Sequence, residues 1–299
     1  MDGSVAAPRP ILALVIRFFA AGSLATMAML VKLAGSRGVA LPELLFWRQA
    51  VTLVVLGSAI ALTGRLATLR TERLGAHARR AFLGVTSMAF VYGAVLLLPL
   101  AEATVLGFTT PLFAVLIALI WFRERIGIYR WTAVGLGFLG VGIVMLPDLG
   151  GGVSVEGLAV GLIAGAFVAL ISFLIQDLNR SESPWSIVFW FVAFTTPALA
   201  LFLPFVGAAH DPTTWGIVIA MGLAGAVAQL FLTWSLRFGS AATIIVIDYT
   251  SLVWAVFYGE AVFGRLPPAT LWLGAPLIIG AGLVVAWREH RLSRRNRAG

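Results

Sequence analysis

The sequence predicts an all-α integral membrane protein with ten transmembrane helices, and three observations support this class. The chain of 299 residues is 60 % hydrophobic and 11 % charged, with a mean hydropathy of +0.99. Soluble globular proteins carry about 25 % charged and about 45–50 % apolar residues. The apolar residues form continuous runs of about twenty, the length that crosses a bilayer core of roughly 30 Å. The second half of the chain also repeats features of the first. The composition and the long apolar runs make lipid the expected solvent.

Each apolar run is bounded by charge, proline or glycine and is expected to form one helix. A continuous apolar stretch indicates a helix, because a membrane β-strand alternates apolar and polar residues over about ten positions. The connections are short, and the longest runs from Gly64 to Arg80. The ten runs cover residues 11–33, 44–63, 81–100, 104–122, 129–146, 156–176, 185–206, 214–236, 241–259 and 270–287.

Arginines in the connections predict the orientation of the chain. If the N-terminus is cytoplasmic and the connections alternate sides, the outer connections contain only Arg37 and Arg265, and all other connection arginines lie inside. This asymmetry follows the positive-inside rule. We therefore expect a multi-pass protein of the cell inner membrane with both termini in the cytoplasm. The net charge of +8 then belongs to the inner loops, and no nucleic-acid partner is expected.

An internal repeat divides the chain into two halves of five helices each. Thr104–Glu124 and Thr243–Glu260 are both apolar runs that begin after alanine and end at a glutamate. Five helices per half invert the second half relative to the first. Inverted-topology repeats are typical of secondary transporters, whose substrate site lies near the membrane midplane. The expected domains are residues 11–147 and 156–288, followed by a basic cytoplasmic tail at residues 289–299.

Ionisable side chains within the spans are costly, by about 2.5–3.5 kcal/mol each on insertion scales. Lys32 and Arg48 fall near the outer ends of their helices, where Lys32 is expected to snorkel and Arg48 to snorkel or line an outer vestibule. Arg17 and Asp248 fall roughly 9 Å and 12 Å from the inner side, at 1.5 Å per residue. These depths predict an ion pair between the halves, acting as a structural lock or an inner gate. The alternative is that Arg17 reaches the headgroups and Asp248 bonds to a nearby hydroxyl.

Other residues are candidates for a substrate cavity or for helix packing. Ser172 and Gln229 lie on helix faces of small and polar residues, which indicate either close helix packing or a cavity wall. Pro111 removes a backbone hydrogen bond inside its run and could kink the helix. Several aromatic side chains fall deep in the spans. The candidate substrate-binding residues are Tyr92, Thr110, Pro111, Ser172, Gln229, Trp234, Asp248 and Tyr249.

The residue types present argue against catalysis and against a bound metal. The chain has no cysteine, and its three histidines have no partner at metal-ligand spacing. The nucleophile and metalloprotease motifs that mark hydrolases are absent from the sequence. We therefore expect no enzyme activity, no metal and no cofactor.

The chain resembles the drug/metabolite transporter superfamily, and within it the EamA-type exporters. The resemblance covers nearly the whole chain and rests on the ten-helix plan, the five-plus-five repeat, and Thr110-Pro111 followed by Arg123-Glu124-Arg125. Gly259-Glu260 keeps the Gly-Glu pair in the second half. Arg123 stands where the family usually has glycine, and Ile247-Asp248 stands where a proline is frequent. Among the exporters, the chain is most similar to the YddG-type branch.

The resemblance implies export of amino acids, aromatic or apolar ones included, or of similar small metabolites, by alternating access. The alternative is a proton-coupled exporter of cationic drugs or toxic compounds that uses Asp248 as its titrating group. Small multidrug relatives couple transport to protons through a glutamate in their first helix. The first apolar run here, residues 11–33, contains no carboxylate, so proton coupling at that position is not supported. The expected partners are a small-molecule substrate and the lipid bilayer, and we expect a monomer.

Overall fold

The structure, a computed structural model, describes residues 10–121, 127–145, 155–238 and 247–298. Over these residues the chain is helical and contains no β-strand. The elements are α1 (Pro10–Ser36), α2 (Leu41–Leu62), the 3-10 helix η1 (Arg65–Leu69), α3 (Leu74–Leu97), α4 (Leu100–Gly107), α5 (Thr110–Trp121), α6 (Ile128–Met145), α7 (Val155–Leu178), α8 (Pro184–Ala200), α9 (Leu203–Val206), α10 (Pro212–Phe238), α12 (Ser251–Phe263) and α13 (Ala269–Ala298).

The helices have the length and composition of membrane spans. Within the described residues, seven helical segments are long and apolar enough to cross a bilayer, and three further apolar helices are shorter. Large apolar side chains on their outer faces are exposed, among them Val54, Phe82 and Leu273 at 67–70 %. Side chains of this kind are stable in contact with lipid, so the predicted class of α-helical multi-pass membrane protein is confirmed.

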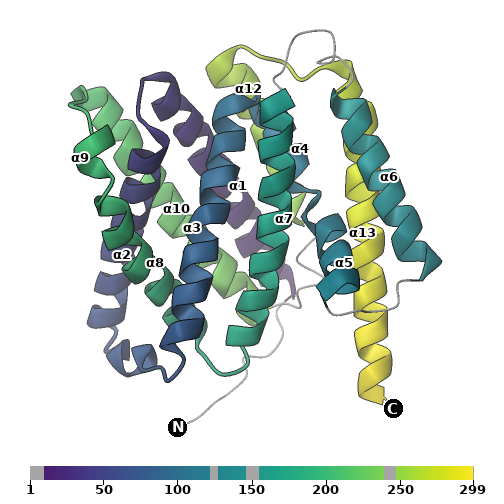
Figure 1. Cartoon of the computed structure of the whole chain (residues 1–299), viewed down its shortest axis with the longest axis horizontal. Helices are drawn as coiled ribbons and strands as arrows, with labels where there is room; N and C mark the ends of the chain where they lie inside the picture. Colours follow the sequence, from purple (N-terminus) through teal and green to yellow (C-terminus); the bar gives the residue numbers. More distant parts are fainter. Residues whose placement is uncertain (1–9, 122–126, 146–154, 239–246, 299) are drawn as a thin grey trace.

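The helices run roughly parallel in one bundle with two distinct ends (Figure 1). One end, the η1 end, carries η1, the α7–α8 connection and the end of α13. The other, the α9 end, carries α9, the α1–α2 connection and the α12–α13 connection. Helices α6 and α13 form a pair at one side of the bundle, whereas α2 and α8 lie at the other.

Helices α6 and α13 approach each other closely at two glycines. A Cβ atom on Gly140 would lie 2.8 Å from the backbone oxygen of Gly274, and one on Gly274 would lie 2.5 Å from the oxygen of Gly140. Small residues allow this kind of backbone contact between membrane helices. The same explanation applies to Gly161 and Gly165 on α7, which pack against Leu106 and Thr109. At these positions the face of small residues serves helix packing.

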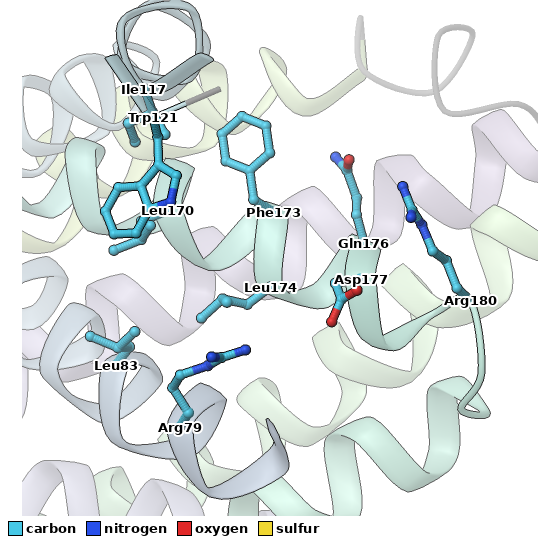
Figure 2. A pocket seen from close by; sticks show the side chains of 10 residues that line it. All are labelled: Arg79, Leu83, Ile117, Trp121, Leu170, Phe173, Leu174, Gln176, Asp177 and Arg180. Atoms are coloured by element: carbon cyan, nitrogen blue, oxygen red, sulfur yellow. The ribbon is translucent and has the colours of Figure 1, made fainter. Parts of the chain in front are cut away.

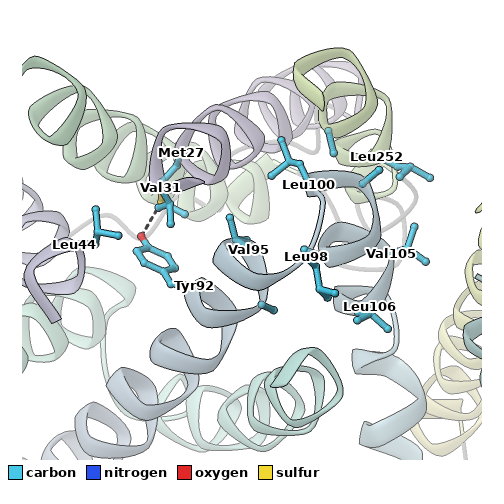
Figure 3. Close-up of a cluster of buried hydrophobic side chains, with 14 of the residues drawn as sticks. Met27, Val31, Leu44, Tyr92, Val95, Leu98, Leu100, Val105, Leu106 and Leu252 are labelled. Carbon is cyan, nitrogen blue, oxygen red and sulfur yellow. Dashed lines mark hydrogen bonds between the residues drawn. The ribbon is translucent and has the colours of Figure 1, made fainter. Parts of the chain in front are cut away.

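A core of buried side chains, which we call the central core, joins helices across the bundle in its half nearer the α9 end (Figure 3). Leu98, Leu106 and Tyr92 are each exposed by 2 % or less. The core joins residues of α1, α2, α3, α4 and α12, which belong to both halves of the sequence. It therefore packs the two halves of the sequence against each other.

The apolar run predicted at 104–122 lies in one candidate span, Leu100–Trp121, but the prediction of one continuous helix is wrong. The structure has two helices, α4 and α5, separated by Phe108 and Thr109. Pro111 lies in the first turn of α5, where its missing N–H costs nothing, and the residue before a proline disfavours the helical conformation. The Thr109 hydroxyl donates to the Leu106 carbonyl at 2.6 Å, and that of Thr110 donates to the Gly107 carbonyl at 2.8 Å. These bonds satisfy carbonyls that the break exposes.

The predicted connection from Gly64 to Arg80 is also too long. Helix α3 begins at Leu74, so Arg80 lies within a helix and is buried. Helix α13 continues through most of the predicted basic tail. The Arg123-Glu124-Arg125 motif lies outside the described residues.

Candidate functional site

An ion pair joins α1 to the segment just before α12. Arg17 Nε lies 2.5 Å from Asp248 Oδ1, and Arg17 Nη2 lies 2.6 Å from Oδ2. The Arg17 side chain is 15 % exposed and that of Asp248 is 35 % exposed. Two parallel charge-assisted hydrogen bonds of this kind fix both the distance and the orientation of the partners. The predicted pairing is therefore present, while its role in transport stays a prediction.

Further contacts continue the α1–α12 interface toward the α9 end. Trp254 packs on Gly22, where a Cβ would lie 3.3 Å from the indole, and its ring lies 5.8 Å from that of Phe18. One turn further, the hydroxyls of Thr26 and Tyr258 are 2.7 Å apart. The sequence gave no direct indication of the Thr26–Tyr258 contact, although the spacing of four between Gly22 and Thr26 and between Trp254 and Tyr258 places each pair on one helix face.

Tyr249 lies in the turn that precedes α12, beside the break between α4 and α5. Its ring meets Phe108 edge-on, with centroids 4.8 Å apart. Its hydroxyl occupies the space that a Cβ on Gly282 would fill, and Pro111 borders the same space. The two irregular segments, one from each half of the chain, are therefore in direct contact.

The other candidate residues have separate surroundings. Tyr92 is buried in the central core, 2 % exposed, and its hydroxyl donates to Met27 Sδ at 3.4 Å. The Ser172 hydroxyl donates to the Val168 carbonyl of its own helix at 2.8 Å. Gln229 is half-buried on α10. Trp234 belongs to α10, but its side chain lies outside the described residues. None of the described candidate side chains lines either of the two cavities at the ends of the bundle.

A cavity of about 410 Å³ opens at the η1 end between α3, α5 and α7 (Figure 2). Its wall is apolar and aromatic, and its rim is polar, with both signs of charge. We call it the η1-end pocket. It is lined by Arg79, Leu83, Ile117, Trp121, Leu170, Phe173, Leu174, Gln176, Asp177 and Arg180. An apolar wall with a few polar groups is typical of small-molecule sites, which span about 300–1,000 Å³.

A second cavity, of about 440 Å³, lies at the α9 end, and we call it the α9-end pocket. It is bordered by the start of α4, by α12 and by the α12–α13 connection, and it contains Lys32, Glu102 and Arg265. Lys32 does not snorkel to the surface as expected. Its ammonium donates to the carbonyls of Val95 and Leu98, at 3.0 and 2.7 Å, and so caps the end of α3.

The α4–α5 segment connects the two pockets. Ile117 and Trp121 of α5 line the η1-end pocket, whereas Leu100 and Glu102 of α4 line the α9-end pocket. The break at Phe108–Thr109 lies between them, against the central core. Within the described residues, no group of three or more histidines and carboxylates could hold a metal.

Long apolar helices and solute-sized pockets at both ends of the bundle are features expected of a membrane transporter. Comparison with known families agrees, because residues 11–146 and 155–287 both match the EamA-like transporter family. The chain belongs to this family, so the predicted superfamily is confirmed. The chain is therefore a multi-pass transporter of the bacterial inner membrane.

Individual relatives differ in the solutes for which they are named. The chain is 31 % identical over 252 residues to the riboflavin transporter of Vibrio cholerae, and the aligned region covers 84 % of each chain. It is also 32 % identical over 235 residues to the riboflavin transporter of Rhizobium johnstonii, and this match covers 77 % of this chain and 76 % of the relative. The pseudopaline exporter of Pseudomonas aeruginosa is 26 % identical over 247 residues, 82 % and 85 % of the two chains.

A solved structure has the same fold. It superposes with a TM-score of 0.60 at 22 % identity and covers 94 % of this chain and 99 % of its own. At this identity the likeness concerns the fold alone.

Proposed function

We propose that this chain is a secondary transporter that moves a small metabolite across the inner membrane by alternating access. The observation that carries the proposal is the pair of pockets at opposite ends of the broken α4–α5 segment, with the break and the buried side chains around it lying between them. A transporter of this kind exposes one pocket at a time while the two halves of the bundle rock against each other.

The proposal includes ten spans in two inverted halves, with both termini in the cytoplasm. The helix contacts support this. If the two halves are repeats, each helix of the first half corresponds to one of the second: α1 to α7, α2 to α8, α3 to α10, α5 to α12 and α6 to α13. A contact between two helices should then recur between their counterparts, and the contact of α1 with α10 does recur as that of α7 with α3. Likewise, the contact of α1 with α12 becomes that of α7 with α5, and that of α2 with α10 becomes that of α8 with α3; all of these contacts occur.

Riboflavin is the first solute to test. Two of the relatives above carry that name at 31–32 % identity. The η1-end pocket supports a planar aromatic solute, because Trp121 and Phe173 supply flat apolar surface and Gln176 supplies an amide. Aromatic amino acids share this chemistry on a smaller scale and form the second group of candidates.

Reconstitution into proteoliposomes tests the function. We expect accumulation of radiolabelled riboflavin above that of empty liposomes, with unlabelled riboflavin competing. A panel of amino acids, with and without a pH gradient, runs in parallel. Uptake of an amino acid but not of riboflavin would replace the substrate, and no uptake of any panel member would contradict the proposed function.

Export of cationic drugs is less well supported. Arg17 already occupies both carboxylate oxygens of Asp248, so a cationic solute would have to displace it. A test is ethidium efflux by wild type and by Asp248→Asn, for which the present proposal expects no efflux above background in either.

A further inference from the structure

Two arginines are buried inside the bundle, away from both pockets. Arg48 on α2 and Arg80 on α3 are each 7 % exposed. No carboxylate among the described residues pairs with either guanidinium. A buried ion costs several kcal/mol in real proteins unless an opposite charge and hydrogen bonds compensate it. The structure thus leaves two positive charges uncompensated within the span region.

The Arg48 guanidinium is only partly satisfied by neighbouring groups. Its Nη1 donates to Gln49 Oε1, and Gln49 Nε2 donates to Thr195 Oγ1 on α8 at 2.5 Å. Its Nε is buried and has no acceptor among the described residues. This nitrogen faces Gly225 on α10, where a Cβ would lie 3.3 Å from it.

Arg80 has the same kind of surroundings. Its guanidinium carbon lies 3.8 Å from the ring centroid of Phe191 on α8, a cation–π contact that covers one face. A ring face offers no acceptor to the N–H groups in the guanidinium plane. Arg80 Nε and Nη1 are buried without an acceptor among the described residues, and a Cβ on Gly84 would lie 3.2 Å from Nη1. At Gly84 and Gly225, the missing Cβ lets the arginine side chain lie close to the helix backbone.

The two arginines meet the same stretch of α8. Phe191 contacts Arg80, and Thr195, one turn later, contacts the amide of Gln49 beside Arg48. One turn is about 5.4 Å along the helix axis. Arg48 and Arg80, which carry three unpaired donor nitrogens, therefore both lie near the same stretch of α8.

We propose that Arg48 and Arg80 form a binding site for an oxyanion, namely a carboxylate or phosphate group, either free or carried by a solute. A carboxylate or phosphate group carries several acceptor oxygens, and guanidinium groups form strong charge-assisted hydrogen bonds with such groups. Gln49 and Thr195 complete the polar wall of the site. Bound there, the anion supplies the negative charge that no carboxylate of the described residues provides.

Thermal unfolding of the purified protein in detergent tests the site. Sodium phosphate or sodium acetate replaces sodium chloride at constant ionic strength and pH, and tryptophan fluorescence reports Tm. We expect at least one of the two anions to raise Tm saturably, by about 2–5 °C, as ligand binding to the folded state does. The phosphate and acetate arms identify the group that binds. No saturable rise in either arm would overturn the proposal.

Variants locate the effect. Arg48→Gln and Arg80→Gln should each abolish the rise in Tm, whereas Arg70→Gln, at an exposed arginine in the connection after η1, should keep it. A rise that persists in both site variants would assign the anion to another place and overturn the proposal. If these variants do not fold, the wild-type titration alone decides.

Discussion

At the scale of single residues, Arg17 and Asp248 make a testable connection between the two halves. Arg17→Asp and Asp248→Arg should each lower the yield of folded protein, since either change places like charges in contact. The free energy of unfolding should fall by less than the roughly 3–5 kcal/mol that breaking a fully buried pair costs, because Asp248 is 35 % exposed. The double swap should restore most of it, as measured by Tm and by the monodisperse fraction in size-exclusion chromatography. A double variant as unstable as the single ones would show that the pairing contributes nothing.

Contacts between single residues could be predicted where they depended only on how deep each residue lies along its helix. Arg17 and Asp248 could be paired from the sequence because the rise per residue of a helix is fixed. The direction of a side chain around its helix depends on neighbouring helices, which the sequence does not reveal. For this reason the sequence left open whether Tyr92 lines a cavity or packs in the core, where it lies, and Arg48 was expected near the outer end of its helix but is buried.

At the scale of helices, the α6–α13 crossing depends on Gly140. Gly140→Ala places a Cβ 2.8 Å from the Gly274 oxygen, so the helices must separate and the protein should lose about 1–3 kcal/mol, the usual cost of overpacking. Gly142→Ala, on the same helix with no atom within 4 Å of its Cβ, is the matched control and should be neutral or slightly stabilising. Tm of both variants in detergent is the measurement. Equal Tm values would show that the crossing can relax at no cost.

The helices themselves could be predicted from apolar runs, because a bilayer requires long apolar segments and internally satisfied backbones. The break at Phe108–Thr109 could not, although Pro111 marked its place. A proline is compatible with both a kinked helix and the start of a new one. Threonine hydroxyls that take up the free carbonyls favour the second, and their direction follows from tertiary packing.

For the whole molecule, the absence of cysteine makes the proposed orientation easy to test. Asn179 is exposed in the α7–α8 connection at the η1 end, and Ala209 is exposed between α9 and α10. Asn179→Cys and Ala209→Cys therefore each place one accessible thiol at a known end of the bundle. A membrane-impermeant maleimide should label Ala209→Cys in intact spheroplasts and Asn179→Cys only after lysis. The reverse pattern would invert the proposed topology, and labelling of both in intact spheroplasts would contradict a ten-span arrangement.

Alternating access predicts that the two pockets respond to the solute in opposite directions. Gln176→Cys places a thiol at the η1-end pocket, and Leu266→Cys places one at the α9-end pocket. Because the α4–α5 segment borders both pockets, a rearrangement that opens one should close the other, and a solute shifts the populations of the two states. The maleimide labelling rate in detergent should therefore rise at one thiol and fall at the other when the transported solute is added. Asn179→Cys and Ala209→Cys should keep constant rates. Changes of the same sign at both pockets would favour a channel that opens at both ends together.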